Sequence, residues 1–475
     1  MFEVILIINI LIALAIIFLE RKDTSATLAW IMVLLFIPIL GTIFYIVFSQ
    51  NISRQKIFRL YENEEEMISA SLKKQSEAIG EGTFEFENKI AAKWTDLIKL
   101  NQSCSHAYFT QDNSIELFID GKEKMKALFD DIENAKSYVN VQYFIIKKDI
   151  VGDAFLKLLI RKAREGVEVR LLVDALGSRG INKELVRKLK ASGGHYAEFF
   201  PSKFKLFNTK LNYRNHRKIV IIDNEIGYVG GFNIAREYVG LKRKFGYWRD
   251  THLKIRGGSV LDLNARFLLD WRSATREKFN MEEVFMEEQE GSGNIGVQIV
   301  SSGPDNTREE IKHGFFKMIT SAKKSIYIQT PYFVPDAPIL EGLKMAAQSG
   351  VEVNVMIPCM PDHMFVYWAT YSYVAELMEE GVNVYIYDNG FLHAKVLAVD
   401  DEICTVGSTN FDRRSFKLNF EANAFIYDAE FTSKIVDSFK EDIKLSHKLT
   451  QELYDQRGSW IKIKEVFSRI LSDVL

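Results

Sequence analysis

The chain has 475 residues, 47% of them apolar and 26% charged, with a formal net charge of −2. This composition is typical of a globular protein, the length is enough for two well-formed cores, and the near-neutral charge indicates no particular class of partner. Cys104, Cys359 and Cys404 have neither disulfide-like nor metal-like spacing, which favours a reducing compartment.

The first 50 residues are markedly apolar. Residues 2–19 contain only two polar side chains, and residues 27–48 contain no charge. Because roughly 20 residues span a bilayer core, we predict a transmembrane helical hairpin over residues 1–50, with spans at about 2–19 and 27–48. A signal peptide is the alternative for the first span. Three basic residues follow the second span against two in the connecting loop, which favours a multi-pass protein of the cell membrane with its body on the cytoplasmic side.

The rest of the chain alternates strand-like and helix-like segments after a charged, helix-prone connector at residues 51–105. Each half contains the same strand–helix–strand order, over residues 137–146, 153–164 and 166–174 and again over residues 325–334, 339–348 and 350–358. We therefore predict an α/β fold with largely parallel strands and an antiparallel hairpin in each of two domains, residues 106–290 and 291–475.

Three segments have compositions that suggest surface contacts. Residues 199–218 and 241–249 combine Lys and Arg with aromatic residues, and could bind an anionic headgroup or an anionic membrane, or could be solvated loops. Residues 459–475 carry apolar side chains at helical spacing, at Trp460, Ile463, Phe467, Ile470, Leu471 and Val474. We predict an amphipathic C-terminal helix whose apolar stripe packs on the second domain, with membrane contact as the alternative.

One short pattern occurs twice. Residues 216–233 read HRKIVIIDNEIGYVGGFN and residues 393–410 read HAKVLAVDDEICTVGSTN, and every matched pair is separated by 177 positions. The pairs are His216 and His393, Lys218 and Lys395, Asp223 and Asp400, Gly230 and Gly407, and Asn233 and Asn410. This indicates an internal duplication with a polar site in each half.

Alternating apolar residues around a polar break predict a β-hairpin for each window. A hairpin without a bulge would place each His opposite the Asn of its own motif. Because strand side chains alternate, His216 and Lys218 share a face and Asp223 points to the other, so the Asp is interpreted as supporting the fold. Imidazole, ammonium and carboxamide groups together suit a phosphate group, and two imidazoles could divide the roles of nucleophile and acid without a metal.

The paired windows resemble the twin H-x-K-x4-D-x6-G-x2-N signature of the phospholipase D superfamily. The resemblance implies duplicated α/β/α units that form a pseudo-twofold pair around one cleft. It also implies a two-step reaction through a phosphohistidine that needs no metal and no cofactor. Residues 20–48 resemble the N-terminal membrane anchor of bacterial cardiolipin synthases, which implies that phosphatidylglycerol is converted to cardiolipin and glycerol.

The resemblance also implies roles for individual residues. The motif residues expected to be catalytic are His216, Lys218, Asp223, His393, Lys395 and Asp400, with His216 as the nucleophile and His393 as the acid. Phosphate contacts are expected from Asn233, Asn410 and Ser408. A carboxylate downstream of each motif is expected to orient the His of that motif. Glu421 fits in the second half, and Asp250 fits in the first if residues 236–246 carry an insertion.

Other functions stay open at this point. The implied partners are phosphatidylglycerol and anionic membrane lipids, with no nucleic acid. A phospholipase D that releases phosphatidic acid and a non-catalytic membrane protein that binds lipid are the alternatives. A nuclease of the same superfamily is disfavoured, because it would not need a transmembrane hairpin.

Overall fold

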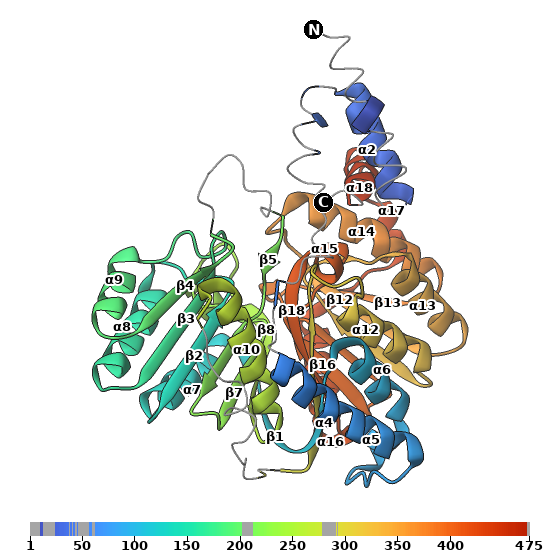
Figure 1. Ribbon diagram of the computed structural model, residues 1–475. Coiled ribbons are helices and arrows are strands. Elements are labelled where there is room, and N and C mark those ends of the chain that lie inside the picture. The colour runs from blue at the N-terminus through green and yellow to red at the C-terminus, as the bar shows by residue number, and fades with distance from the viewer. Residues whose placement is uncertain are drawn as a thin grey trace.

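The computed structural model (Figure 1) describes residues 10–12, 24–37, 39, 41–42, 45, 57–58, 62–201, 212–277, 291 and 293–472. The predicted span at 2–19 lies almost wholly outside these residues. At the second predicted span the structure describes α2 (Thr24–Phe36) and further helical positions at residues 39, 41–42 and 45. No helix among the described residues combines the length and apolarity of a membrane span, so the predicted two-helix anchor is not supported here.

The first half is a seven-stranded sheet in the order β4-β3-β2-β6-β7-β8-β1, of which β2, β3 and β4 are parallel. Its strands are β1 (Phe109–Asp120), β2 (Tyr138–Tyr143), β3 (Glu168–Asp174), β4 (His195–Phe199), β6 (Ile219–Ile222), β7 (Ile226–Gly230) and β8 (Trp248–Arg256). Its helices are α7 (Gly121–Glu133), α8 (Ile150–Arg164), α9 (Lys183–Ala191) and α10 (Ser259–Thr275).

The second half repeats this arrangement in the order β19-β13-β12-β10-β15-β16-β18-β9. Its strands are β9 (Ile295–Ser302), β10 (Ser325–Gln329), β12 (Glu352–Pro358), β13 (Asn383–Tyr387), β15 (Val396–Val399), β16 (Ile403–Gly407), β18 (Asn419–Tyr427) and β19 (Ser446–Lys448). Its helices are α12 (Glu310–Ser321), α13 (Ala337–Gln348), α14 (Met364–Glu379) and α16 (Ala429–Lys444). Strand β9 pairs with β1, so the two sheets are continuous. The predicted duplication of an α/β unit is confirmed.

Each sheet is covered by helices on both faces (Figure 1). Apolar residues of α7, α8 and α9 form one outer core, and those of α12, α13 and α14 form another. Between the halves, α10 and α16 share a third core with the inner faces of both sheets, where Ile219, Leu263, Val396 and Phe439 are buried. This α/β/α layering agrees with the predicted fold class.

Helix starts in this fold follow local sequence signals. Asp120, Asp149, Asn182 and Asp428 precede α7, α8, α9 and α16, and each side chain accepts hydrogen bonds from backbone N–H groups of the first helical turn. Such caps typically contribute about 1 kcal/mol each, because they satisfy N–H groups that have no partner within the helix.

The connector helices are α4 (Glu62–Glu81), α5 (Lys89–Lys93) and α6 (Thr95–Ser105). They pack on the second half, where Trp94 and Leu97 join the same core as Phe315 of α12. The indole N–H of Trp94 donates a 2.9 Å hydrogen bond to Glu402, which lies at the turn of the second motif hairpin.

The C-terminal segment forms α17 (Gln451–Asp455) and α18 (Ser459–Leu471). The amphipathic helix is therefore present, but its orientation differs from the prediction. Ile463, Phe467 and Ile470 of the apolar stripe are between 56% and 66% exposed, whereas Glu465 and Ser468 on the other face are 2% exposed. The prediction that the apolar stripe packs on the second domain is wrong, because polar contacts hold the helix in place.

Both motif hairpins are present, as β6–β7 and β15–β16. Their register differs by one residue from the predicted one, since Ile222 pairs with Ile226 and Val399 pairs with Ile403. When this register is extended from the turn to the open end of the hairpin, each His lies opposite the residue that precedes the motif Asn. The shift arises because the turn has three residues, of which the first two are left-handed in both hairpins, with φ between 53° and 57°. Asp and Asn occupy these positions, and they tolerate this conformation better than most residues.

Candidate active site

The two motif histidines lie where the halves exchange short strands. Strand β5 (Arg214–Asn215) of the first half pairs with β18, and β14 (Phe391–Leu392) of the second half pairs with β8. The histidines follow directly. The backbone N–H of His216 donates to the Phe420 carbonyl at 2.9 Å, and that of His393 donates to the Arg249 carbonyl at 2.7 Å. These reciprocal contacts are what an approximate twofold axis between the repeats produces.

The carboxylates that bind the histidines come from the opposite repeat. Nδ1 of His216 lies 3.0 Å from both oxygens of Glu421, and Nδ1 of His393 lies 2.6 Å from Asp250. The expectation that each carboxylate orients the His of its own motif is therefore wrong. The cause is the strand exchange, which places each His beside the β-strand of the other half that carries the carboxylate.

Asp250 and Glu421, the two carboxylates predicted to orient the histidines, nevertheless occupy equivalent positions in the two repeats. Gly230 pairs with His252 and Gly407 pairs with Asn423, so Asp250 and Glu421 occupy the same position relative to their hairpins. The spacing from motif to carboxylate is longer in the first half. A short helix follows the motif in both halves, η1 (Arg236–Val239) and α15 (Arg413–Lys417), so the additional residues of the first half lie after η1, before β8. The predicted insertion is confirmed.

The charges around the histidines determine their tautomer. The Glu421 and Asp250 carboxylates are fully buried, which disfavours their charge, but neighbouring His and Lys groups hold both pKa values below the usual range. An ionised carboxylate can only accept, so Nδ1 of each histidine donates its hydrogen and Nε2 keeps a free lone pair. Burial lowers the pKa of His216, and it lowers the pKa of His393 to about 4, so both imidazoles are neutral at pH 7.

The two lysines lie among the same groups. Lys218 and Lys395 are almost completely buried, and each ammonium donates to the carbonyl of the His two residues earlier. Nζ of Lys395 also lies 2.8 Å from Nδ1 of His393, but that nitrogen already donates its hydrogen to Asp250 and has no lone pair left in the ring plane. Burial lowers the pKa of Lys218 to about 7 and that of Lys395 to about 8.

The clusters of the two repeats influence each other electrostatically. Lys395 of the second repeat lowers the pKa values of His216 and Lys218, and Asp250 of the first repeat raises the pKa of Lys395. The structure therefore brings the His and Lys residues of both motifs into one charged centre, as the resemblance to the phospholipase D superfamily implied.

The expected phosphate-binding residues lie close to this centre and make contacts within the protein. Asn233 accepts from the Ile145 N–H at 3.1 Å and donates to the Tyr238 hydroxyl at 2.9 Å. The Ser408 hydroxyl accepts from the Ala422 N–H of β18 at 3.0 Å. Within the described part of the chain, the buried Oδ1 of Asn410 has no hydrogen-bond partner. A contact between these residues and phosphate stays a prediction.

Asp223 and Asp400 are placed elsewhere. The carboxylate of Asp223 accepts from the backbone N–H groups of Lys136, Ser137 and Tyr138 at the start of β2, at 2.7 to 2.8 Å. Asp400 does the same for residues 323–325 at the start of β10. Their inclusion among the catalytic residues is therefore not supported, whereas the interpretation from strand alternation, that they support the fold, agrees with these contacts.

Arg217 is one of three neighbouring residues that the sequence did not single out. Its guanidinium is fully buried, forms an ion pair with Asp270 at 2.7 Å, and donates to the Glu421 carbonyl at 3.0 Å. Because Arg217 stands between His216 and Lys218, its side chain points to the opposite face of the strand. This alternation is the sequence signal that could have identified it. Tyr238 has its ring 6.3 Å from that of His393, and Asp362 raises the pKa values of His393 and Lys395, but no sequence pattern marked either residue.

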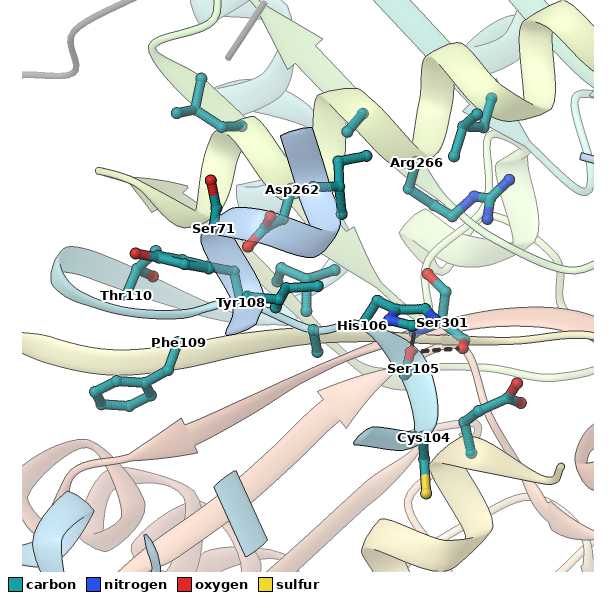
Figure 2. A pocket seen from close by; sticks show the side chains of 18 of the residues that line it. Ser71, Cys104, Ser105, His106, Tyr108, Phe109, Thr110, Asp262, Arg266 and Ser301 are labelled. Atoms are coloured by element: carbon teal, nitrogen blue, oxygen red, sulfur yellow. Dashed lines mark hydrogen bonds between the residues drawn. The ribbon is translucent and has the colours of Figure 1, made fainter. Parts of the chain in front are cut away.

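A cavity of about 910 Å³ lies between the connector helices and α10. Figure 2 shows Ser71, Tyr108 and Asp262 around it, with Arg266 further along the wall and the Ser105 hydroxyl bonded to the Ser301 carbonyl at 3.0 Å. Among the described residues that line it, neither motif histidine is present. Arg217 also lines the cavity, on the strand face opposite to that of His216, so the cavity adjoins the paired-histidine centre from behind that strand.

Comparison with known proteins identifies the family. The family described as "Cardiolipin synthase, PLD-like domain" matches residues 128–245 and 315–443, which hold the two motifs. The chain is 50% identical over 470 residues to the major cardiolipin synthase ClsA of Bacillus subtilis (strain 168), with 99% of this chain and 98% of that protein covered. The chain belongs to the cardiolipin synthase family of the phospholipase D superfamily.

Other relatives agree with this membership. A cardiolipin synthase of Listeria monocytogenes serotype 4a (strain HCC23) is 50% identical over 473 residues, covering 99% of this chain and 98% of the relative. One of Staphylococcus aureus (strain Mu50 / ATCC 700699) is 47% identical over 470 residues, covering 99% of this chain and 95% of the relative. The "Phospholipase_D-nuclease N-terminal" family matches residues 7–50. This family member is accordingly an enzyme.

A solved structure supports the fold. The crystal structure of phosphatidylserine synthase from Haemophilus influenzae Rd KW20 superposes with a TM-score of 0.58 at 16% identity, and covers 80% of this chain and 97% of that one. At this identity the likeness shows that the duplicated α/β architecture is shared.

Proposed function

We propose that this cardiolipin synthase family member transfers the phosphatidyl group of one phosphatidylglycerol to another, giving cardiolipin and glycerol through a phosphohistidine. The observation that carries the proposal is the pair of histidines with free Nε2 atoms, each held by a carboxylate of the opposite repeat. A phosphodiester anion between them would meet one imidazole on each side and the ammonium groups of Lys218 and Lys395. Such fixed charges stabilise a phosphoryl transition state without reorganising at the moment of reaction.

In the first step, Nε2 of one histidine attacks phosphorus and the bond from phosphorus to the headgroup glycerol oxygen breaks. The other histidine, protonated when the anion is bound, gives its proton to that oxygen, and glycerol leaves. In the second step, the terminal hydroxyl of a second phosphatidylglycerol loses its proton to the now neutral histidine. Its oxygen attacks phosphorus, the phosphorus–nitrogen bond breaks, and cardiolipin is released.

His216 is the proposed nucleophile and His393 the proposed acid. The charged groups that shift the pKa of His216 are Glu421, against Lys218 and Lys395. Those that shift the pKa of His393 are Asp250 and Asp362, against Lys395. Burial outweighs these carboxylates and lowers the pKa of His393 to about 4, so a bound phosphodiester anion would have to raise that pKa before His393 holds the proton that the leaving glycerol needs. The order of the two roles follows the resemblance to the phospholipase D superfamily.

Residues 1–50 are the proposed anchor in the cell membrane, in two passes with the body on the cytoplasmic side. The family match over residues 7–50 and the uncharged stretch at 27–48 support this proposal. Anionic lipid would be attracted by Lys242 and Lys244, whose ammonium groups lie 4.9 and 5.1 Å from the Phe245 ring, in the loop that leads to Trp248 beside His393. Residues 202–211 of the other basic stretch lie outside the described residues.

The test is a product assay on purified full-length protein, with labelled phosphatidylglycerol in mixed micelles that contain a chelator. We expect labelled cardiolipin and one glycerol for each cardiolipin, with no product from His216→Ala. Phosphatidic acid as the main product would replace the transferase by a hydrolase. Phosphatidylglycerol left intact in every detergent and vesicle tried would contradict the proposed substrate.

A further inference from the structure

Helix α18 presents its apolar side outward. Trp460, Ile463, Val466, Phe467 and Ile470 recur at helical spacing and are between 56% and 68% exposed. Soluble proteins rarely expose several large apolar side chains on one helix face. Such a face usually marks a contact with another protein or with a membrane. The exposure persists although α2 is present at the same end of the molecule (Figure 1).

Polar contacts fix this orientation. The fully packed side of α18 carries Glu465, whose carboxylate forms an ion pair with Arg457. Arg469 forms an ion pair with Glu376 of α14, and the Ser472 hydroxyl lies 3.3 Å from that of Tyr373 on the same helix. The apolar face of a surface helix ordinarily packs on the core of the protein. In α18 the polar face packs on the protein instead, and the apolar face is exposed.

Two further exposed apolar residues lie at the start of α14, the helix on which α18 packs. Met364 and Phe365, the first residues of α14, are 52% and 54% exposed. They follow closely on Asp362, whose charge raises the pKa values of His393 and Lys395. The apolar surface therefore begins a few residues from a group that acts on the active site.

Cationic side chains accompany this surface. The Lys464 ammonium lies 5.5 Å from the ring centre of Trp368 and 5.9 Å from that of Trp460, and Lys462 lies on the same helix. Indole rings beside lysines are typical of helices that lie in the headgroup region of an anionic bilayer. The charge and the aromatic content fit an anionic lipid surface better than a second protein.

We infer that the outer face of α18, together with Met364 and Phe365, rests in the surface of an anionic bilayer and holds the active-site side of α14 at the lipid headgroups. The contact is independent of any membrane-spanning segment. It places the site where diacyl substrates lie, so that a lipid need not leave the bilayer to reach His393.

The first experiment measures the contact itself in the full chain, reconstituted in phosphatidylglycerol-containing nanodiscs. Bimane is attached to Phe467→Cys, and to Lys440→Cys on α16 as the control, in a Cys104→Ser, Cys359→Ser background in which the remaining Cys404 is fully buried. Lipids with a nitroxide on the acyl chain should quench the label at 467 several-fold more than the label at 440. Equal quenching overturns the inference.

Other outcomes of the same experiment also contradict it. Shielding of the label in detergent as well as in nanodiscs would mean that other residues of this chain cover α18. Label-to-label contact that grows with protein density would mean that a second copy covers it. Because quenching needs no turnover, failure of the proposed reaction and failure of this inference are distinguishable.

A second experiment removes the apolar face. The double variant Ile463→Glu, Phe467→Glu should keep the unfolding temperature of the parent, since both side chains are exposed. It should also keep activity on a short-chain phosphatidylglycerol in solution, but lose most activity on vesicles, through a higher KM for lipid. Lys440→Glu is the matched control. Unchanged vesicle activity in the double variant would contradict the inference.

Discussion

Nδ1 of His216 lies 3.0 Å from both carboxylate oxygens of Glu421, a residue 205 positions further along the chain. The reciprocal pair is His393 with Asp250, at 2.6 Å. Each repeat thus lacks the carboxylate for its own histidine, and the reactive centre exists only when both repeats are assembled. This relationship gives the first prediction.

Glu421→Gln should lower turnover by about 10³- to 10⁴-fold, because a carboxamide cannot fix the Nδ1–H tautomer as an ionised carboxylate does. If His216 is the nucleophile, this variant should form phosphohistidine as poorly as His216→Ala, although Glu421 lies in the other repeat. Rapid-quench labelling measures the intermediate. If Glu421→Gln instead forms the intermediate as His393→Ala does, Glu421 acts on the histidine of its own repeat and the prediction is contradicted.

The roles of the histidines can be separated with the leaving group. His393→Ala should lose activity on phosphatidylglycerol but regain formation of the intermediate on a phosphatidyl ester of p-nitrophenol, whose anion leaves without a proton. His216→Ala should remain inactive on both substrates. Release of nitrophenolate is followed by absorbance. Rescue of His216→Ala and not of His393→Ala would reverse the two roles.

Gly231 lies against the Asp250 carboxylate. A Cβ at this position would come within 1.9 Å of Oδ1 of Asp250, so Gly231→Ala must displace that carboxylate and with it His393. We expect a loss of about 10²-fold in kcat, typical of a small misplacement of a catalytic group. Gly180→Ala is the matched control, since a Cβ there meets no atom within 4 Å. Equal activity of both variants would contradict the prediction.

The pH dependence should reflect the buried lysines. With pKa values of about 7 for Lys218 and about 8 for Lys395, both are charged below these values and lose their charge as the pH rises through 7 to 8. Because kcat/KM reports groups of the free enzyme, it should fall across this window. Lys395→Arg, which stays charged, should move the upper part of the fall to higher pH. A fall only above about pH 10, as for an ordinary lysine, would contradict the prediction.

Asp400 should matter for stability more than for chemistry. Asp400→Asn weakens the hydrogen bonds from the N–H groups of Lys323, Lys324 and Ser325, and should cost about 1–3 kcal/mol in the free energy of unfolding. Denaturant unfolding measures the loss. The folded fraction should keep turnover close to that of the parent. Abolished turnover with unchanged stability would restore Asp400 to the catalytic residues.

The fold class, both hairpins, the duplication and the clustering of His216 with Lys218 could be predicted from the sequence. These features depend on the side-chain periodicity of strands and helices and on motif spacing, which a few neighbouring residues encode. The position of Asp223 outside the reactive centre followed from the same alternation.

Only the tertiary structure decided which carboxylate serves which histidine, because residues 205 positions apart meet through the pairing of β5 with β18, which no local pattern encodes. The same holds for α18. Its spacing predicted an apolar stripe, but which face packs depends on partners such as Glu376 on another helix, and these ion pairs turned the stripe outward. Local periodicity determines whether a segment forms a helix or a strand, whereas contacts between distant segments determine which of its faces packs on the protein.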